Sequence, residues 1–360
     1  IGSRLPIIQG TSFAFIPIML PFKAFGLGAI FTAAFIGGIF QIWIGKMLKP
    51  IRHMFPPLVT GIVVLMIGIS LLKVGFKYAG GGVWLMNNKP EIFGNWEHLT
   101  IAGTVLIVAL LTNLRGKGMV SAASILIGII AGFIVAAMLG EVRWGKIAAA
   151  DWFAFPMPLQ YGIDFVWGAV ILMLFMSIVT TIETIGDISA TTMGGANREA
   201  TNKELSGGIM ADGVGTAFAS IFNAMPNTSY SQNAGLVAFT GVISRHVGTV
   251  AGVILILLGL FPKLGGIIAA MPDSVIGGAA IIMFGLIAGA GIKLISKSEM
   301  SQRNILILAL SLSFGIGLYA FPEFVAHIPD FGIKLKLLLT TGLIPAGMLA
   351  FILNAILPKK

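Results

Sequence analysis

Three acidic residues fall within apolar stretches, where a carboxyl group is costly and is therefore expected to have a function. Glu183 and Asp187 are four residues apart and share one face of a helix, and Asp212 lies in the next apolar stretch. A charged group at the centre of a membrane helix costs about 2.5–3.5 kcal/mol, so such residues usually face a cavity. Carboxyl groups that exchange protons there suit a proton-coupled carrier. Asp187 and Asp212 could instead cap helices or anchor loops at the membrane rim.

A second polar group is the run from Tyr230 to Gly235. Its neighbouring amides, Gln232 and Asn233, each offer hydrogen-bond donors and an acceptor, which suit the imide and lactam edges of a heterocycle. A helix N-terminus beside them would add free backbone N–H groups. Phe13 and Tyr230 could flank a flat ring from two sides, although aromatic residues at helical spacing more often only pack.

The elements that position these residues are predicted to be membrane helices. Of 360 residues, 57% are hydrophobic before the 47 glycines are counted, and only 10% are charged, whereas a soluble domain is about 25% charged. The mean hydropathy is +0.97. A soluble fold of this size would lack the polar side chains to cover its surface. The chain is therefore predicted to be an integral protein of the cell (plasma or inner) membrane.

Charge and cysteine content exclude several other classes. The chain has no cysteine and four scattered histidines, so neither a metal site nor another cofactor is expected, apart from a proton as coupling ion. The net charge is +9, and the basic residues that produce it lie between the apolar runs. This placement indicates membrane topology rather than nucleic-acid binding. If successive connections alternate between the two sides of the membrane, 14 of the 23 Lys and Arg residues lie on the same side as the 49–54 connection. The positive-inside rule makes that side, and the C-terminus, cytoplasmic.

Twelve apolar segments are candidate spans within a single membrane transport domain that covers residues 1–360. A span needs about 20 mostly apolar residues, and the segments at 11–22, 100–113, 206–221 and 229–241 are shorter. The twelve lie near 11–22, 26–48, 55–75, 100–113, 120–139, 163–185, 206–221, 229–241, 247–262, 274–292, 303–320 and 336–357.

The sequence contains an internal repeat. Gly10 to Phe13 resembles Asn227 to Tyr230, an offset of 217, and Pro56 to Gly61 resembles Pro272 to Gly277, an offset of 216. Seven spans per period invert the second copy, an architecture typical of secondary transporters whose substrate site lies where the repeats meet. Because the first match lies in two short segments, we expect two broken helices that line a cavity. Two ordinary packing contacts are the alternative.

These motifs resemble the nucleobase–ascorbate transporter family, also called nucleobase:cation symporter type 2. The resemblance is carried by Glu183 to Asp187, Ala211 to Gly213, and Gln232 to Gly235 followed by Thr240, while Gln9 to Phe15 resembles the start of the third family helix. It covers essentially the whole chain. It implies an all-α membrane fold of fourteen helices in two inverted repeats of seven, divided into a core and a gate, with two short helices whose extended stretches cross at the site.

The count of seven helices per repeat also assigns residue ranges to the two repeats. The first repeat would cover about 1–140 and lack two N-terminal helices, so that the chain begins at helix three, and the second would cover about 163–357.

The resemblance also implies an import of a purine nucleobase by proton symport and alternating access. Glu183 would hold the base and Gln232 would read its edge. Gln at position 232 resembles xanthine and urate members, whereas uracil members tend to carry Glu. The predicted substrate-binding residues are Ser12, Phe13, Glu183, Tyr230, Ser231 and Gln232, with Asp187, Asp212 and Asn233 as polar positions for coupling or structure, and no catalytic or metal-binding residue.

Three alternatives stay open at this point. A uracil permease of the same family differs in substrate alone. An anion carrier of the same fold conflicts with Glu183, whose charge would repel anions. An intramembrane aspartyl protease could use Asp187 and Asp212, but Thr184 to Asp187 lacks the Gly-x-Gly-Asp pattern of such enzymes. Proton against sodium coupling and the oligomeric state are also open, with a homodimer as one candidate assembly.

Overall fold

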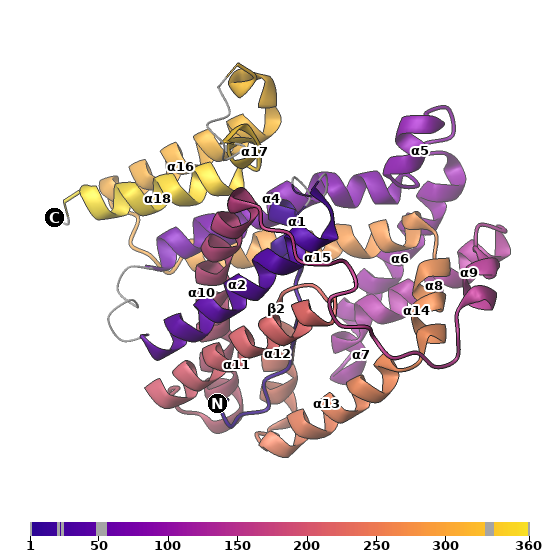
Figure 1. The fold of residues 1–360 in the computed structure, drawn as a ribbon, viewed down its shortest axis with the longest axis horizontal. Helices are drawn as coiled ribbons and strands as arrows, with labels where there is room; N and C mark the ends of the chain where they lie inside the picture. The colour runs from indigo at the N-terminus through magenta and orange to yellow at the C-terminus, as the bar shows by residue number, and fades with distance from the viewer. Residues whose placement is uncertain (1, 20–21, 23–24, 48–55, 328–334, 359–360) are drawn as a thin grey trace. The chain divides into compact units, whose positions relative to one another are not determined.

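The chain folds into a mostly helical structure that divides into two compact units. The computed structural model describes residues 2–19, 22, 25–47, 56–327 and 335–358. The first unit comprises Ile1–Ser70, Pro156–Gly248 and Ala288–Lys360, and the second comprises Leu71–Phe155 and Thr249–Ile287. Figure 1 follows the elements from the N-terminus in indigo to the C-terminus in yellow.

Most elements belong to a single unit, whereas three helices contribute to both. The first unit contains β1 (Gln9–Thr11), η1 (Phe13–Phe15), α1 (Ile16–Met19), α2 (Leu27–Lys46), α10 (Trp167–Ala196), α11 (Asn202–Ile221), β2 (Asn227–Ser229), α12 (Ser231–Thr240), α16 (Gln302–Ala320), η4 (Pro322–Val325), α17 (Leu335–Thr340) and α18 (Leu343–Ile356). The second contains α5 (Val83–Asn88), α6 (Trp96–Arg115), α7 (Met119–Ala122), α8 (Ser124–Met138), α9 (Trp144–Ala149) and α14 (Pro262–Ala270). The shared helices are α4 (Pro57–Ala79), α13 (Arg245–Gly259) and α15 (Asp273–Ile295).

Several helices have the length and composition of membrane spans. Among the described residues, α2, α4, α6, α10, α15 and α16 each qualify, and the pair α13 and α14, bent by 76°, would form a seventh span. The prediction of an all-α polytopic membrane protein is thereby confirmed. The 49–54 connection, on which the predicted orientation depends, lies outside the described residues.

Some helix ends differ from the predicted segments because polar residues form the first or last turn. Helix α11 begins at Asn202 rather than near 206, since Thr201 and Glu204 form a reciprocal capping box at its start. Helix α6 begins at Trp96 rather than near 100, where Asn95 accepts a hydrogen bond from the His98 backbone N–H. Helix α10 continues about three turns beyond 185, as far as Ala196.

Close packing of α2 against α11 sets the position of the buried polar residues in the first unit. A Cβ atom on Gly38 would lie 2.7 Å from the Gly213 carbonyl oxygen, and one on Gly213 would lie 2.6 Å from the Gly38 carbonyl oxygen. The two backbones are therefore in direct contact, which small residues allow between membrane helices. This approach brings Gln41 of α2 next to Asp212 of α11, at 2.8 Å from amide nitrogen to carboxylate oxygen.

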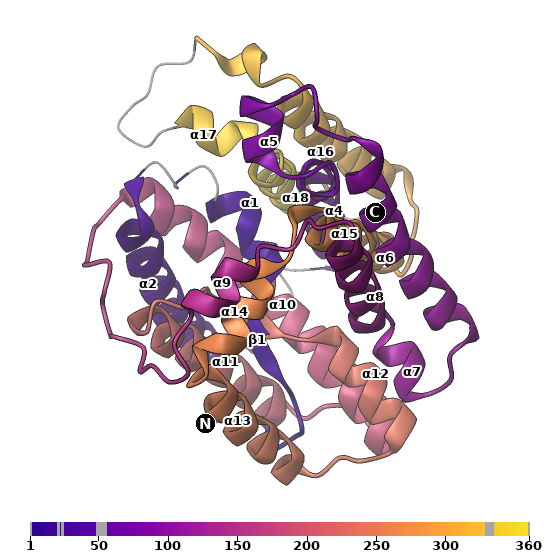
Figure 2. The same cartoon turned by 90° about the vertical axis from the view of Figure 1, so that its right-hand side faces the viewer.

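Helices α16 and α18 lie side by side, as Figures 1 and 2 both show. The guanidinium of Arg303, at the start of α16, donates to the backbone oxygens of Leu357 at 3.1 Å and Asn354 at 2.6 Å. These carbonyls belong to the C-terminal end of α18, where they have no partner within the helix. The arginine therefore links the two helices in an antiparallel arrangement.

The second unit is organised around α6, α8 and part of α15. Gly128 and Gly132 of α8 lie against Val105 of α6, so closely that a Cβ atom on Gly128 would be 2.8 Å from the Val105 carbonyl oxygen. A buried apolar cluster surrounds this contact and includes Ile101, Val105, Ala136, Val275 and Ala279. The outward faces of both helices carry exposed apolar side chains, among them Leu114 and Met138. Such faces suit contact with lipid.

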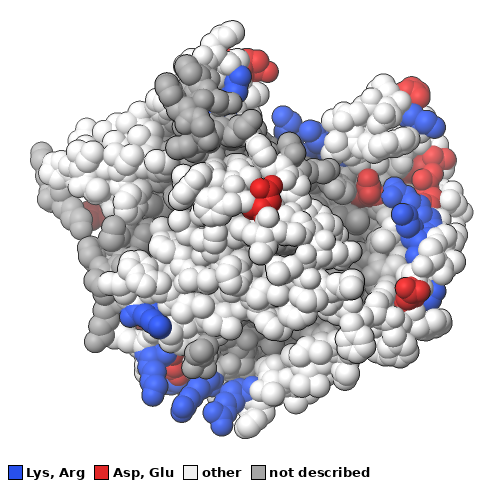
Figure 3. Space-filling model, in the orientation of Figure 1, with Lys and Arg blue, Asp and Glu red and all other residues white. Residues whose placement is uncertain are grey.

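Charged side chains are sparse over the face seen in Figure 3. Most of that face is uncharged, and Lys and Arg side chains gather along its lower edge. An uncharged surface with charges at its margin is the pattern expected of a protein whose apolar surface meets lipid.

Candidate functional site

The site is built around two short strands, each of which directly precedes a short helix. β1 pairs with β2 in antiparallel fashion, with Gln9 opposite Ser229, Gly10 opposite Thr228 and Thr11 opposite Asn227. Two further backbone bonds extend the pairing, from the Tyr230 N–H to the Ile8 carbonyl at 3.0 Å and from the Ser12 N–H to the Pro226 carbonyl at 3.2 Å. Extended backbone at membrane depth needs such internal partners. Each strand is followed by a short helix, which confirms the prediction of two broken helices with extended stretches.

Tyr230 closes the second strand against the first. Its phenol hydroxyl donates to the Thr11 carbonyl at 3.1 Å, and a Cβ atom on Gly10 would lie 2.4 Å from the phenol oxygen. The ring therefore lies over the glycine and remains 37% exposed. Phe13, its counterpart in the repeat, is the first residue of η1 and is 39% exposed. Each of the two aromatic residues thus leaves part of its surface uncovered by the protein.

Asp187 fixes the second strand and the helix that follows it. Its Oδ2 accepts from the Ser229 hydroxyl at 2.5 Å and its Oδ1 accepts from the Ser231 hydroxyl at 2.7 Å, and the residue is only 7% exposed. Hydrogen bonds to a charged group contribute about 1.5–3 kcal/mol each. The carboxylate therefore holds the end of β2 and the first turn of α12 on helix α10.

Asp212 is the most deeply buried acid of this group, at 0% exposure. Its Oδ2 accepts from the Gln41 amide at 2.8 Å and from the Thr184 hydroxyl at 3.1 Å. Its Oδ1 has no hydrogen-bond partner within the described residues. The Ser229 hydroxyl lies 3.3 Å from the Thr184 hydroxyl. Two hydroxyl groups in contact with each other therefore lie between Asp187 and Asp212.

Glu183 and Gln232 differ from these residues because no hydrogen bond within the described part of the chain engages their side chains. Gln232 is exposed in the first turn of α12. Glu183 is half-buried and lies within electrostatic range of Asp187 and Asp212. A carboxyl group and an amide left unpaired beside a broken helix are suited to bind a polar ligand. The described residues contain no group of three or more His, Cys, Asp or Glu arranged to hold a metal ion.

Two of the predicted site residues have a role in holding the backbone. The Ser12 hydroxyl accepts from the Ala14 N–H at 3.1 Å and caps η1. The Asn233 side chain donates to the Pro6 carbonyl at 2.6 Å and ties α12 to the segment before β1. Both residues therefore position the crossing strands. Each of these two hydrogen bonds is made to a backbone group of the protein itself.

Three residues of the network, Gln41, Thr184 and Ser229, were not predicted from the sequence. Gln41 is an amide within the apolar segment 26–48, and that isolation is the signal that could have identified it, by the same reasoning that identified the acids. Thr184 stands between Glu183 and Asp187, but a threonine in a membrane helix usually bonds to its own backbone and gives no such signal.

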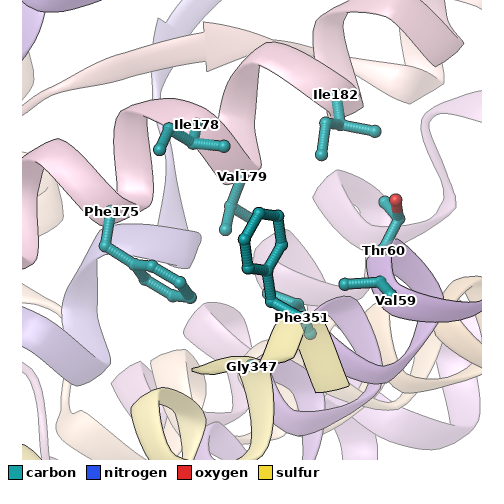
Figure 4. Close-up of a pocket in the computed structure, with 9 residues that line it drawn as sticks. Val59, Thr60, Phe175, Ile178, Val179, Ile182, Gly347 and Phe351 are labelled. Atoms are coloured by element: carbon teal, nitrogen blue, oxygen red, sulfur yellow. The ribbon is translucent and has the colours of Figure 1, made fainter. Parts of the chain in front are cut away.

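A small cavity borders another face of α10. Ile178, Val179 and Ile182 of that helix point toward Phe351 of α18 and Val59 of α4 (Figure 4). The cavity has a volume of about 20 Å³ and exposes no polar surface. It lacks the polar partners that a heterocycle or a water molecule needs, so it is a packing gap rather than a binding site.

Comparison with known sequences identifies relatives along the whole chain. The model Xan_ur_permease, described as the permease family, matches residues 1–324. A protein of Clostridium perfringens provisionally named a purine permease is 38% identical over 361 residues, covering 100% of this chain and 78% of the relative. The xanthine permease XanP of Escherichia coli is 34% identical and covers 100% and 80%. The uric acid permease PucJ of Bacillus subtilis is 34% identical and covers 98% and 79%.

Solved structures share the fold at low sequence identity. The transmembrane domain of the cyanobacterial bicarbonate transporter BicA matches with a TM-score of 0.56 and 17% identity, over 98% of this chain and 85% of that chain. SLC26A9 matches with a TM-score of 0.59 and 13% identity, over 98% and 57%. These similarities concern the arrangement of the helices.

Proposed function

The chain belongs to the nucleobase–ascorbate transporter family and is a membrane transporter of nucleobases rather than an enzyme, and on this premise we propose that it imports a purine, xanthine or urate, by proton symport. Transport proceeds by alternating access around the crossing of β1 and β2. The xanthine and uric acid specificities in the names of XanP and PucJ support this substrate class.

The observation that carries the proposal is the pair of unused polar side chains at the crossing. Glu183 accepts hydrogen bonds from ring N–H groups of the base, because a carboxylate only accepts. Gln232 pairs with a ring N–H and a neighbouring carbonyl at once, because an amide both donates and accepts. The half-exposed rings of Phe13 and Tyr230 stack on the flat base.

Proton coupling is supported by the three carboxyl groups around Thr184. Glu183, Asp187 and Asp212 interact electrostatically, and three negative charges within one membrane region repel each other. Binding of a proton removes one of these charges, which favours the loaded carrier. The pairing of Asp187 and Asp212 with separate hydroxyl groups also differs from a protease dyad, in which two carboxyl groups share one proton directly.

Movement of α10 during transport is supported by the surface it presents to α4 and α18. That surface is mostly apolar around the small cavity of Figure 4, where the Thr60 hydroxyl is bonded within its own chain segment, to the Pro56 carbonyl. A shift of α10 along the described residues of this surface breaks no hydrogen bond. The crossing of β1 and β2, in contrast, is held by several backbone hydrogen bonds.

The cytoplasmic end of the first unit is proposed to be the end where α2 finishes and α11 starts. The Ser206 hydroxyl donates to the Gly45 carbonyl at 2.6 Å, which places these two helix ends together. Lys46 and Lys203 lie at these ends, as the positive-inside rule favours for the cytoplasm. On this orientation the C-terminus is cytoplasmic in the cell membrane, and a homodimer is the proposed assembly.

A competition panel tests the substrate and the coupling ion. Cells that express the full-length protein are given radiolabelled xanthine with an excess of unlabelled xanthine, urate, guanine or uracil, with and without a protonophore. We expect xanthine and urate to compete best and the protonophore to abolish accumulation. Competition by uracil alone would replace the purine proposal with a uracil permease, and dependence on sodium at fixed pH would replace proton symport.

A further inference from the structure

We propose that Ser229 and Thr184 form a proton relay between Asp187, which holds the broken crossing, and Asp212, which stores the proton out of contact with the substrate. This inference rests on the proposed proton symport and deepens it. It assigns a role in coupling to Thr184, whose hydroxyl contacts Asp212 and Ser229.

The relay consists of three consecutive oxygen–oxygen contacts of hydrogen-bond length in the first unit, and all three are hydrogen bonds when the Asp187 carboxyl group is protonated and donates to Ser229 Oγ. Asp187 Oδ2 and Ser229 Oγ are 2.5 Å apart, Ser229 Oγ and Thr184 Oγ1 are 3.3 Å apart, and Thr184 Oγ1 and Asp212 Oδ2 are 3.1 Å apart. Each hydroxyl has one proton to give and lone pairs to accept another. The four groups can therefore pass a proton in either direction without a water molecule.

Every transfer in the relay balances. The protonated carboxyl group of Asp187 gives its proton to Ser229 Oγ while Ser229 gives its own proton to Thr184 Oγ1, and Thr184 gives its own proton to Asp212 Oδ2. At each oxygen of the two hydroxyls one O–H bond forms and one breaks. Asp187 ends as the carboxylate and Asp212 as the neutral acid, with no oxidant or co-reactant.

The surroundings of Asp212 suit storage. The residue is 0% exposed, and its Oδ1 has no partner within the described residues. A carboxylate in such a place costs more than a neutral acid, because buried charge needs full pairing. Gln41, also buried, donates to Oδ2 and to the Thr180 hydroxyl, so it fixes the carboxyl group in line with Thr184.

The groups that face the relay come from five elements. Helix α10 supplies Glu183 as the third titratable group, which lies within electrostatic range of both aspartates. The other contributions are neutral, namely Gln41 from α2, Ser229 from β2 and Ser231 from α12, while α11 supplies Asp212 itself. Because Glu183 lies within electrostatic range of both acids, its charge links substrate binding to the choice of aspartate that carries the proton.

The test separates proton coupling from substrate binding with Thr184→Val, which keeps the side-chain shape and removes the hydroxyl. Two assays are compared in proteoliposomes: exchange of labelled for unlabelled xanthine, which moves no net proton, and accumulation driven by an imposed inward proton gradient. We expect accumulation to fall about a hundredfold or more, the order of a lost proton-transfer group, with exchange within about twofold of wild type.

Matched variants exclude a simple packing effect. Thr181→Val lies about one turn earlier on α10, is also buried, and its hydroxyl donates to the Ser177 carbonyl outside the relay, so it should behave as wild type. Thr184→Ser restores the hydroxyl and should restore accumulation. Ser229→Ala interrupts the relay at a second point and should reproduce the loss of accumulation.

The outcomes distinguish the relay from the proposed function. Accumulation by the wild type that ignores the proton gradient overturns proton symport and the relay together. A wild type driven by protons with a Thr184→Val variant that accumulates normally overturns the relay alone. Loss of exchange and accumulation in parallel, without rescue by Thr184→Ser, assigns Thr184 a purely structural role and also overturns the relay.

Discussion

Gly10 lies directly beneath the phenol ring of Tyr230, and a Cβ atom at position 10 would lie 2.4 Å from the phenol oxygen and 3.0 Å from the ring carbon that bears it. The two residues come from the two copies of the internal repeat, 220 positions apart. Their contact, together with the hydrogen bond from Tyr230 to the Thr11 carbonyl, fixes one wall of the site.

Gly10→Ala should displace the Tyr230 ring and raise the KM for xanthine several-fold, because the ring can no longer cover β1. Uptake kinetics at equal surface expression measure the effect. Tyr230→Phe removes the atom in closest contact, so the double variant should recover part of the affinity. Gly103→Ala serves as control, since nothing lies within 4 Å of that position. An unchanged KM in Gly10→Ala would show that the ring position does not affect binding.

Asp187→Asn should abolish uptake while the protein still reaches the membrane. The amide keeps one acceptor oxygen, so at most one of the bonds from Ser229 and Ser231 persists in its present form, and each bond to the carboxylate contributes about 1.5–3 kcal/mol. Uptake of labelled xanthine and surface biotinylation are measured together. Asp164→Asn, in an exposed connection, is the control. Uptake near the wild-type rate would show that β2 and α12 do not depend on this carboxylate.

Glu204→Gln should lower the Tm of the detergent-solubilised protein at neutral pH by a small amount, because the ion-pair partner of Glu204, Arg198, is exposed and such pairs contribute little to stability. The hydrogen bonds from Arg198, with help from Thr201, lower the pKa of Glu204 from 4.5 to about 2. The stabilisation is therefore complete above the unfolded pKa and is lost as the pH falls from 4.5 toward 2.

The difference in Tm between wild type and Glu204→Gln should accordingly narrow over that acidic range. Glu199→Gln changes a nearby exposed acid and should have no comparable effect. A difference in Tm that persists unchanged at pH 3 would contradict the ion pair as its source.

Gln232→Glu should shift preference from xanthine toward uracil-like ligands. A carboxylate cannot donate to a purine carbonyl, and once the bound base covers position 232 a mismatched polar group there costs about 1–3 kcal/mol, or roughly five- to a hundred-fold in affinity. Competition of unlabelled xanthine, urate and uracil against labelled xanthine gives the ratio. Equal weakening of all three ligands would mean that Gln232 only supports α12.

The sequence predicted those features that depend on local pattern. The repeated tetrapeptides at Gly10 and Asn227 identified both broken segments, because small polar residues and a nearby proline interrupt an apolar run. The acids were found because a charge in such a run is rare. The partners of Asp187 and Asp212 could not be predicted, since Ser229, Thr184 and Gln41 are common residue types whose roles appear only when α2, α10, α11 and β2 pack together.

The binding of a purine by Glu183 is tested most directly with purified protein and radiolabelled xanthine, by comparing the wild type with Glu183→Gln in a scintillation proximity assay. An amide of the same size replaces the only unpaired carboxyl group among the three acids of the site in the described chain, and Glu199→Gln serves as the matched control. We predict that Glu183→Gln binds no measurable xanthine while Glu199→Gln binds as the wild type does. Wild-type affinity in Glu183→Gln would contradict the assignment of this residue as the group that holds the base.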